Sequence, residues 1–201
     1  MFIGKYNKSV IVTYIGACLS IIGIYLILNE NISDAIICLI FAGICDLFDG
    51  KIARMCKRDD VEKEFGKHID SLVDVISFIA FPAVIGMKLF SSLYAWTNIV
   101  ILLYSLSGVI RLAWFNIVSS KEKEVKYFVG VPVAYIALIL PIIYAVQLFF
   151  KINLDFIYPI IYGLFAFFFI LNIKIPKPRG IWYVFFSIVA IFVTIIVKMV
   201  G

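Results

Sequence analysis

Four aspartates stand out because the chain around them is apolar enough to lie in a lipid bilayer. They fall in the stretches Cys45-Asp-Leu-Phe-Asp-Gly50 and Gly66-Lys-His-Ile-Asp70-Ser-Leu-Val-Asp74, and are Asp46, Asp49, Asp70 and Asp74. An ionised carboxylate inside a membrane is costly, so such groups mark an ion pathway or a reaction site. We therefore expect the function of the protein to reside at these residues.

The spacing of the aspartates predicts that they converge. Asp46 and Asp49 are three positions apart, and Asp70 and Asp74 are four apart, so each pair lies on one helix face. Because a short loop joins the two helices, we expect them to be antiparallel neighbours. Four carboxylates repel one another in a low dielectric unless a multivalent cation neutralises them. Oxygen ligands without histidine or thiolate favour Mg²⁺, Mn²⁺ or Ca²⁺ over zinc or copper, so we predict a site for one or two metal ions.

Composition places these residues in an all-α integral membrane protein. Of 201 residues, 64% are hydrophobic and 15% charged, and the mean hydropathy is +1.08, which excludes a soluble globular protein. A membrane-spanning helix needs about 20 apolar residues. Seven segments qualify, with six to eight possible, and the first is predicted to be a retained helix, not a cleaved signal. No linker or repeat divides the chain, which predicts a single domain, 1–201. The segments are about 9–28, 33–57, 67–88, 92–118, 131–150, 153–172 and 181–200.

Basic residues predict the orientation of this bundle. With the N-terminus in the cytoplasm, only Lys88, Lys151 and Lys198 face outward, and Arg111 within the fourth helix is left unassigned. Cytoplasmic loops are enriched in Lys and Arg. The sequence therefore predicts a multi-pass protein of the cell membrane whose polar active site faces the cytoplasm. The formal net charge of +5 also suits contact with anionic headgroups.

Other chemically capable residues carry less information. The four cysteines lack the spacing and histidine partners of a zinc site and are interpreted as packing residues. His68, the one histidine, lies two positions before Asp70 and so on another helix face, which favours a surface role. Gly50, Ala53 and Gly66 flank the acid pairs. They either leave room for a ligand or let helices pack closely.

The residues around the aspartates resemble a family signature. The run Asp46-x-x-Asp49-Gly50-x-x-Ala53-Arg54, then eleven residues, then Gly66-x-x-x-Asp70-x-x-x-Asp74, resembles that of the CDP-alcohol phosphotransferases. These membrane enzymes move a phosphatidyl or related group from a CDP-linked donor to an alcohol and release CMP. The resemblance implies a metal-dependent transferase of phospholipid biosynthesis.

Site roles follow from that resemblance. It implies that two divalent ions, Mg²⁺ or Mn²⁺, are held by the first three aspartates, with Asp74 completing the cluster and also acting as general base. Gly50, Ala53 and Gly66 would leave room for the cytidine, and Arg54 would lie near the nucleotide. Thr13 occupies the place of a nucleotide contact in relatives, although Ser9 and Val10 replace the Pro and Asn that precede it there.

A second resemblance concerns the acceptor. The run Arg111-Leu-Ala-Trp-Phe-Asn116, followed by Gly130-Val-Pro132, is similar to the phosphatidylserine synthase branch, although Trp114 replaces a second arginine. Arg111 is the candidate for the serine carboxylate, since guanidinium forms bidentate pairs with that group. The other interpretation is that it neutralises the aspartates or snorkels to the interface. Asn116 is a candidate to bind serine or to cap the helix end.

The resemblance also implies the partners and leaves alternatives open. The donor would be CDP-diacylglycerol or CDP-archaeol, the acceptor L-serine, and the assembly a homodimer in the bilayer, with no nucleic-acid partner. An acceptor such as glycerol 3-phosphate or inositol phosphate would call for a basic pocket for a second phosphate. A cation transporter could use the aspartates but has no evident need for Gly50, Ala53, Arg54 and Gly66 at their spacing.

Overall fold

The computed structural model describes residues 4–5, 8–90, 95–121, 127–176 and 181–201. Within these ranges the chain is almost entirely helical and forms seven continuous helices, one of which joins the labelled segments α3 and α4. The bounds are α1 Lys8–Leu28, α2 Ile32–Met55, α3 Asp60–Asp74, α4 Phe81–Phe90, α5 Ala95–Lys121, α6 Ile136–Phe150, α7 Ile157–Ile170 and α8 Ile181–Val200.

The predicted all-α membrane fold is confirmed. Five of the described helices are long and apolar enough to cross a membrane, namely 10–28, 60–90, 96–118, 133–150 and 183–200. The predicted third helix is longer than expected, since it begins at Asp60. The start predicted for the fourth helix, residue 92, falls outside the described residues. α7 has 14 residues, which at ~1.5 Å each give only about 21 Å, short of a ~30 Å hydrocarbon core.

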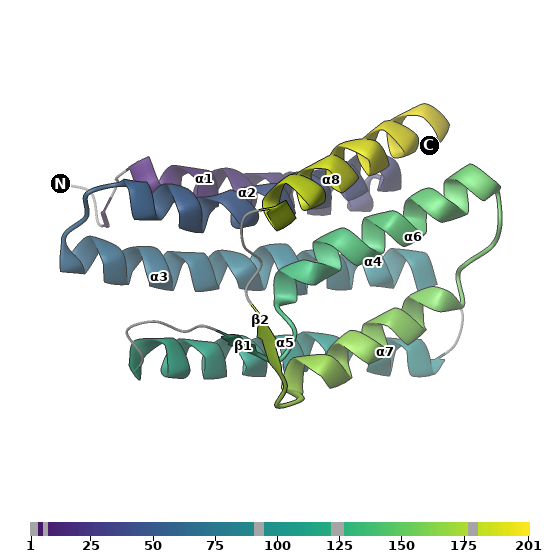
Figure 1. The fold of residues 1–201 in the computed structure, drawn as a ribbon. Coiled ribbons are helices and arrows are strands. Elements are labelled where there is room, and N and C mark those ends of the chain that lie inside the picture. Colours follow the sequence, from purple (N-terminus) through teal and green to yellow (C-terminus); the bar gives the residue numbers. More distant parts are fainter. Residues whose placement is uncertain (1–3, 6–7, 91–94, 122–126, 177–180) are drawn as a thin grey trace.

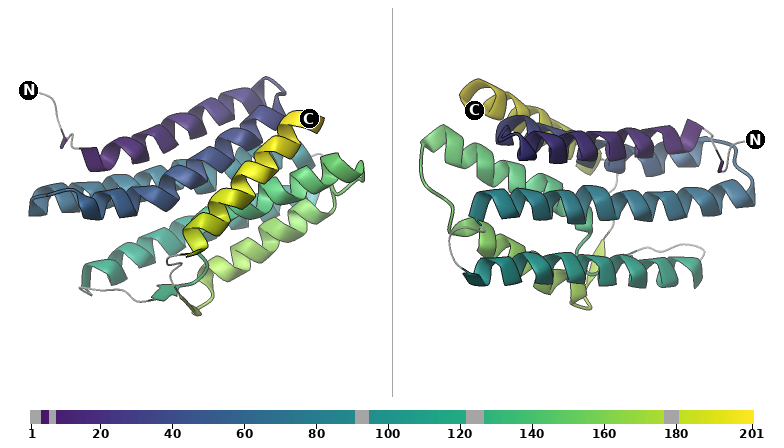
Figure 2. Two further views of the ribbon diagram at one scale, coloured as in Figure 1. Left: turned by 45° about the horizontal axis from the view of Figure 1, so that its top comes forward. Right: turned by 180° about the vertical axis from the view of Figure 1, so that it is seen from behind.

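The helices form a bundle in which the N-terminal segments supply the longest members. α1 packs along α2, and α5 packs along α7. α8 lies across α2 and α6, so the C-terminus returns to the N-terminal pair (Figure 1). Figure 2 shows from two further sides that α1, α2, α3 and α5 extend past the ends of α6, α7 and α8. One end of the bundle is therefore built mainly by α1, α2, α3 and α5.

The core lies in the half of the bundle away from that end. Its large, fully buried side chains include Phe78, Phe81, Ile85, Tyr104 and Tyr162. Exposed apolar side chains cover α5, α7 and α8 on their outer faces, as expected where lipid replaces water. Packing and not hydropathy therefore identifies the inner face of each helix.

A short β-pair ties two connections together. β1 (Tyr127–Val129) pairs antiparallel with β2 (Lys174–Pro176), which the sequence did not predict. Gly130 follows β1 with a positive φ of 74°, and a Cβ there would lie 2.8 Å from the Phe169 carbonyl oxygen. Pro132 then leads into a 3₁₀ turn, Val133–Tyr135, so α6 begins five residues later than predicted, at Ile136. The Gly-Val-Pro run thus shapes the entrance to α6.

The long third helix contains a π-helical turn, Val75–Ala80, directly after Asp74. In this turn the backbone N–H of Phe81 bonds to the carbonyl of Ile76, five residues back. Pro82 explains the irregularity, because it has no N–H for the Phe78 carbonyl and its ring crowds that carbonyl. The Tyr104 hydroxyl donates to the Phe78 carbonyl at 2.5 Å instead. The helix therefore continues through the membrane with a widened turn beside the aspartates.

Candidate active site

The antiparallel helices α2 and α3 bring the aspartates together. One oxygen from each of Asp46, Asp49 and Asp70 can be chosen so that all three lie within 4.8 Å of one another. Asp74 lines the same small cavity as these three residues. The carboxyl groups of Asp46 and Asp74 approach to hydrogen-bonding range, as do those of Asp49 and Asp70. The convergence predicted from helical spacing is therefore present.

Thr13 on α1 closes the third side of the cluster. Its buried hydroxyl donates to Asp49 Oδ2 at 3.0 Å. The same cavity is lined by Gly16 and Ser77, which also come from outside α2. Thr13 thus orients a carboxylate, and the nucleotide contact suggested for it from the sequence stays a prediction.

Arg111 on α5 supplies the positive charge opposite the aspartates. It is 94% buried, with a relative exposure of 6%, and it interacts electrostatically with Asp74 and Asp46. Its guanidinium carbon lies 5.3 Å from the centre of the Phe115 ring. Its Nε has no hydrogen-bond partner among the described residues. A buried guanidinium with an unused donor is costly, so the position suits an acidic ligand group.

Asn116 holds the C-terminal part of α5 against α3. Its Nδ2 donates to Ser71 Oγ at 2.7 Å, and Lys67 donates to its backbone carbonyl at 3.4 Å. Ser71 is the residue after Asp70. Trp114, which replaces the second arginine of the family run, is exposed. Asn116 therefore makes a helix-to-helix contact at the edge of the site.

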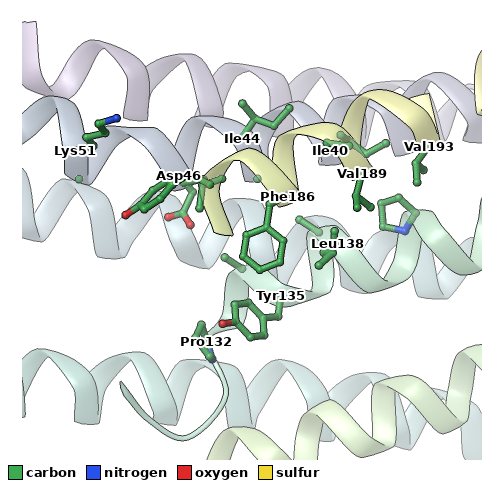
Figure 3. A pocket seen from close by; sticks show the side chains of 18 of the residues that line it. Ile40, Ile44, Asp46, Lys51, Pro132, Tyr135, Leu138, Phe186, Val189 and Val193 are labelled. Atoms are coloured by element: carbon green, nitrogen blue, oxygen red, sulfur yellow. The ribbon is translucent and has the colours of Figure 1, made fainter. Parts of the chain in front are cut away.

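A larger pocket of about 270 Å³ opens beside Asp46, between α2, α6 and α8. Its polar end is lined by Asp46, Gly50, Lys51 and Arg54, together with Tyr183. Its far end is apolar, and Figure 3 shows Ile40, Val189 and Val193 there. Asp46 also lines the smaller acidic cavity, so the two spaces adjoin at this residue. The pocket offers cationic groups at one end and an apolar wall along the rest.

The small residues of the signature occupy different surroundings. A Cβ on Gly50 would meet only Arg54 Nη1, at 3.9 Å, so this position leaves open space in the pocket. A Cβ on Gly66 would lie 3.4 Å from Arg58 Nη1 and 3.8 Å from Val10. Ala53 is partly exposed near the end of α2 and is not among the residues lining either cavity. Gly50 and Arg54 thus lie together, while Gly66 and Ala53 lie outside the cavities.

The donor set fits a hard divalent cation. Among the described residues the ligand group consists of carboxylates only: His68 is exposed beside Glu64, and Cys45 lines the acidic cavity but does not belong to the group. Oxygen-only ligands in this number suit Mg²⁺ or Mn²⁺. Asp46, Asp49 and Asp70 are the residues that would hold such ions.

Sequence reasoning missed several residues around the site. Ser77 lines the acidic cavity, and its hydroxyl bonds to that of Ser20 at 2.7 Å. Its position three residues after Asp74, on the same helix face, was a usable signal. Lys51 and Tyr183 line the larger pocket. No sequence spacing links Tyr183 on α8 to α2, so only the tertiary structure reveals it.

Comparisons with known proteins agree with this geometry. Residues 7–170 match the family model described as CDP-alcohol phosphatidyltransferase. The chain is similar to the archaetidylserine synthase of Methanothermobacter thermautotrophicus, at 32% identity over 68% of this chain and 57% of that one. It is also similar to the CDP-diacylglycerol–serine O-phosphatidyltransferases of Methanocaldococcus jannaschii (32% identity; 84% of this chain, 75% of that one) and Bacillus subtilis (29%; 61% and 67%). The chain spans only part of some relatives. It covers 57% of the M. thermautotrophicus protein and 42% of the CDP-diacylglycerol–serine O-phosphatidyltransferase of Mycobacterium bovis.

Proposed function

Because the chain belongs to the CDP-alcohol phosphatidyltransferase family, we propose that it transfers a phosphatidyl group, or its archaeal ether-lipid equivalent, from a CDP-lipid to L-serine. The donor is CDP-diacylglycerol or CDP-archaeol, and the second product is CMP. The relatives named as phosphatidylserine or archaetidylserine synthases support this choice of acceptor. The chain works as one membrane domain, 1–201, whose active site faces the cytoplasm.

Arg111 is the observation that carries the choice of serine. It is buried, it adjoins Asp46 and Asp74, and its Nε lacks a hydrogen-bond partner among the described residues. A serine carboxylate would complete this guanidinium with a bidentate pair. An ethanolamine or choline acceptor has no carboxylate to do so. Phosphorylated acceptors would need further cationic groups, and none of the described residues that line the acidic cavity is basic. Lys51 and Arg54 line the larger pocket, where we propose that they bind the phosphates of the nucleotide.

The chemical step uses residues from both sides of the cluster. Asp74 accepts the proton of the serine hydroxyl, and the serine oxygen forms a bond to the lipid-bearing phosphorus. The bond from that phosphorus to the bridging oxygen breaks, and the electron pair leaves with CMP. Arg111 orients the serine, while Lys51 and Arg54 bind the nucleotide phosphates at the polar end of the larger pocket. Gly50 leaves room there for the nucleotide.

Asp46, Asp49 and Asp70 would hold two divalent ions, with Asp74 at the edge of the set. Such ions, when bound, neutralise charge on the diphosphate and the leaving group. Thr13 keeps Asp49 oriented through its hydroxyl. Binding of Mn²⁺ can be measured as the loss of the electron paramagnetic resonance signal of the free ion during a titration. We expect the wild type to bind Mn²⁺ and Asp49→Asn to bind it more weakly.

The test of the function is an acceptor comparison. Purified protein in detergent or nanodiscs receives a CDP-lipid with Mg²⁺ or Mn²⁺, and CMP release is measured with serine, glycerol 3-phosphate or inositol phosphate. We expect release that depends on serine and stops on addition of a chelator. Release that ignores serine and follows a phosphorylated acceptor would overturn the serine assignment. Parallel donors with ester and archaeal ether chains identify the lipid.

The family resemblance also implies a homodimer, and we propose this state for the chain. Multi-angle light scattering of the purified protein in detergent gives the protein mass of the particle. A mass of one chain at all concentrations used for activity would rule the dimer out.

A further inference from the structure

The mechanism above leaves unexplained the irregular turn that follows Asp74. Residues of the π-turn Val75–Ala80 form hydrogen bonds with side chains of two other helices in the buried part of the bundle. On the α1 side, Ser20 Oγ bonds to Ser77 Oγ at 2.7 Å. On the α5 side, the Tyr104 hydroxyl donates to the Phe78 carbonyl at 2.5 Å. The residues that these hydroxyls bind, Ser77 and Phe78, follow Asp74 by three and four positions and line the same small cavity.

The Tyr104 bond joins the two sides of the reaction site on its core side, as the Asn116–Ser71 bond does at the other edge. Tyr104 and Arg111 are seven residues apart on α5, which is two turns and therefore the same helix face. Phe78 and Asp74 are four residues apart on the long third helix, which is about one turn. The two helices run in opposite directions (Figure 1). One hydrogen bond thus joins the helix that carries the base to the helix that carries the guanidinium.

The packing around Tyr104 fixes the direction of its hydroxyl, and burial strengthens the hydrogen bond to the Phe78 carbonyl. Tyr104 is fully buried, with 0% exposure, and its ring packs 4.9 Å from that of Tyr162 and 5.5 Å from that of Phe169. Pro82 has no N–H for the Phe78 carbonyl, and the Tyr104 hydroxyl donates to this carbonyl. Sliding α5 along α3 would leave a carbonyl and a hydroxyl unpaired in an apolar interior.

We propose that Tyr104 is a positioning residue that sets the register of Arg111 against Asp74. It touches neither substrate, and it acts through Arg111. This inference rests on the proposed function, in which Arg111 orients the acceptor and Asp74 takes its proton. The π-turn presents the Phe78 carbonyl to which Tyr104 donates, and this bond holds the register at the core side of the site.

The experiment compares Tyr104→Phe with a matched control on the full-length protein. Tyr162→Phe removes the same group from a neighbouring ring, whose hydroxyl donates to the Pro82 carbonyl from α7, a helix without a site residue. We expect Y104F to raise the KM for serine by about tenfold, because misplacing a reacting group by ~1 Å costs up to about 10²-fold. The KM for the CDP-lipid should change little in Y104F, and both constants should change little in Y162F.

A double-mutant cycle separates positioning from general loosening of the fold. In an Arg111→Ala background, Tyr104→Phe should change kcat/KM for serine by less than about twofold, since the residue through which it acts is gone. Additive effects, or equal kinetic losses in Y104F and Y162F, would overturn the proposal. A wild-type protein that ignores serine would instead contradict the proposed function, and the cycle is then run with the acceptor that it does use.

Pro82→Ala tests the same hydrogen bond by changing the surroundings of its acceptor, the Phe78 carbonyl. This variant serves as the test if Y104F does not fold. The new N–H at position 82 can bond to the Phe78 carbonyl in place of the Tyr104 hydroxyl, and the ring that opens the π-turn is removed. A selective rise in the KM for serine is again expected. Serine kinetics that match the wild type in a folded P82A protein would overturn the proposal.

Discussion

At the scale of single residues, four carboxylates and one guanidinium define the site. Three aspartates form the compact group that suits metal ions, and Asp74 adjoins that group and faces Arg111. Thr13 and Asn116 make contacts with Asp49 and Ser71, so their side chains organise the site's edges. The four aspartates look alike in the sequence. Their different contacts in the structure are the basis for proposing that three hold metal ions and that Asp74 acts as the base.

Asp74→Asn tests the proposed base. The amide cannot accept the proton of the serine hydroxyl, so we expect turnover to fall by about 10²- to 10⁴-fold. Binding of the CDP-lipid, measured by calorimetry in the presence of Mg²⁺, should stay within a few-fold of the wild type, since the other three aspartates remain. A variant that keeps full activity would exclude Asp74 as an essential base.

Arg111→Ala tests the carboxylate contact. A hydrogen bond between charged groups contributes about 1.5–3 kcal/mol, so the KM for serine should rise by roughly 10- to 100-fold. The KM for the CDP-lipid should rise less. Trp114→Ala, an exposed position on the same helix, is the matched control and should leave both constants near the wild type. A larger effect on the CDP-lipid than on serine would count against the proposed contact.

At the scale of elements, the start of α3 is fixed by local chemistry. Asp59 accepts from the Glu62 N–H at 2.6 Å, and Glu62 accepts in return from the Asp59 N–H at 3.1 Å. This capping box lies on the connection between the two aspartate helices. It sets where α3 begins and hence the level at which its acids stand opposite those of α2.

Asp59→Asn should therefore destabilise the protein in a pH-dependent way. The Glu62 N–H lowers the pKa of Asp59 below its ordinary value of 3.8. A group whose pKa is lowered by folding adds stability above its unfolded pKa of about 3.9 and loses it as the pH falls through the folded value. The difference in thermal unfolding between wild type and D59N should be present at neutral pH and shrink below about pH 4.

Asp60→Asn is the control for that measurement. Asp60 carries the same charge in the same turn and pairs with Lys63 at 2.9 Å, but it does not cap the helix. Its replacement should change the midpoint of unfolding less than D59N does at neutral pH. Because an amide oxygen at position 59 can still accept the Glu62 N–H, this comparison tests the charge of the cap. An equal loss in both variants would show that any negative charge in the first turn, and not the charge-assisted bond of Asp59, accounts for the stabilisation.

At the scale of the whole molecule, ion pairs at the two ends of the bundle differ. Lys88 pairs with Glu30 at 2.7 Å and Lys198 with Asp34 at 3.0 Å, at the end predicted to face outward. Lys5 pairs with Asp59 at 3.5 Å at the other end, where the sequence concentrates its basic loops. The positive-inside prediction therefore assigns the acid cluster to the cytoplasmic half of the membrane.

Cysteine labelling tests this orientation. In a background where the four native cysteines are replaced, Glu64→Cys and Ile152→Cys place single thiols at exposed sites on opposite ends of the bundle. A membrane-impermeant maleimide should label residue 152 in intact cells and residue 64 only in inverted vesicles. The opposite pattern would place the site on the outer face and contradict the predicted localisation.

The sequence by itself determined the fold class, seven helical segments and the convergence of the aspartates. Hydropathy over about 20 residues reports a membrane helix, and a spacing of three or four residues reports a shared face. These are local properties, so a single chain is enough to read them. The boundaries of α3 and α6 were less accurate, because a capping box and a Pro-led 3₁₀ turn shifted their starts.

Only the tertiary structure decided which distant groups complete the site. The pairing of Thr13 with Asp49, the pocket that joins Tyr183 to α2, and the bond from Tyr104 to the π-turn each link helices far apart in the chain. In a membrane every helix has an apolar surface, so hydropathy does not tell which face meets protein and which meets lipid. That choice depends on side-chain packing and on buried hydrogen bonds, and these exist only once the helices are assembled.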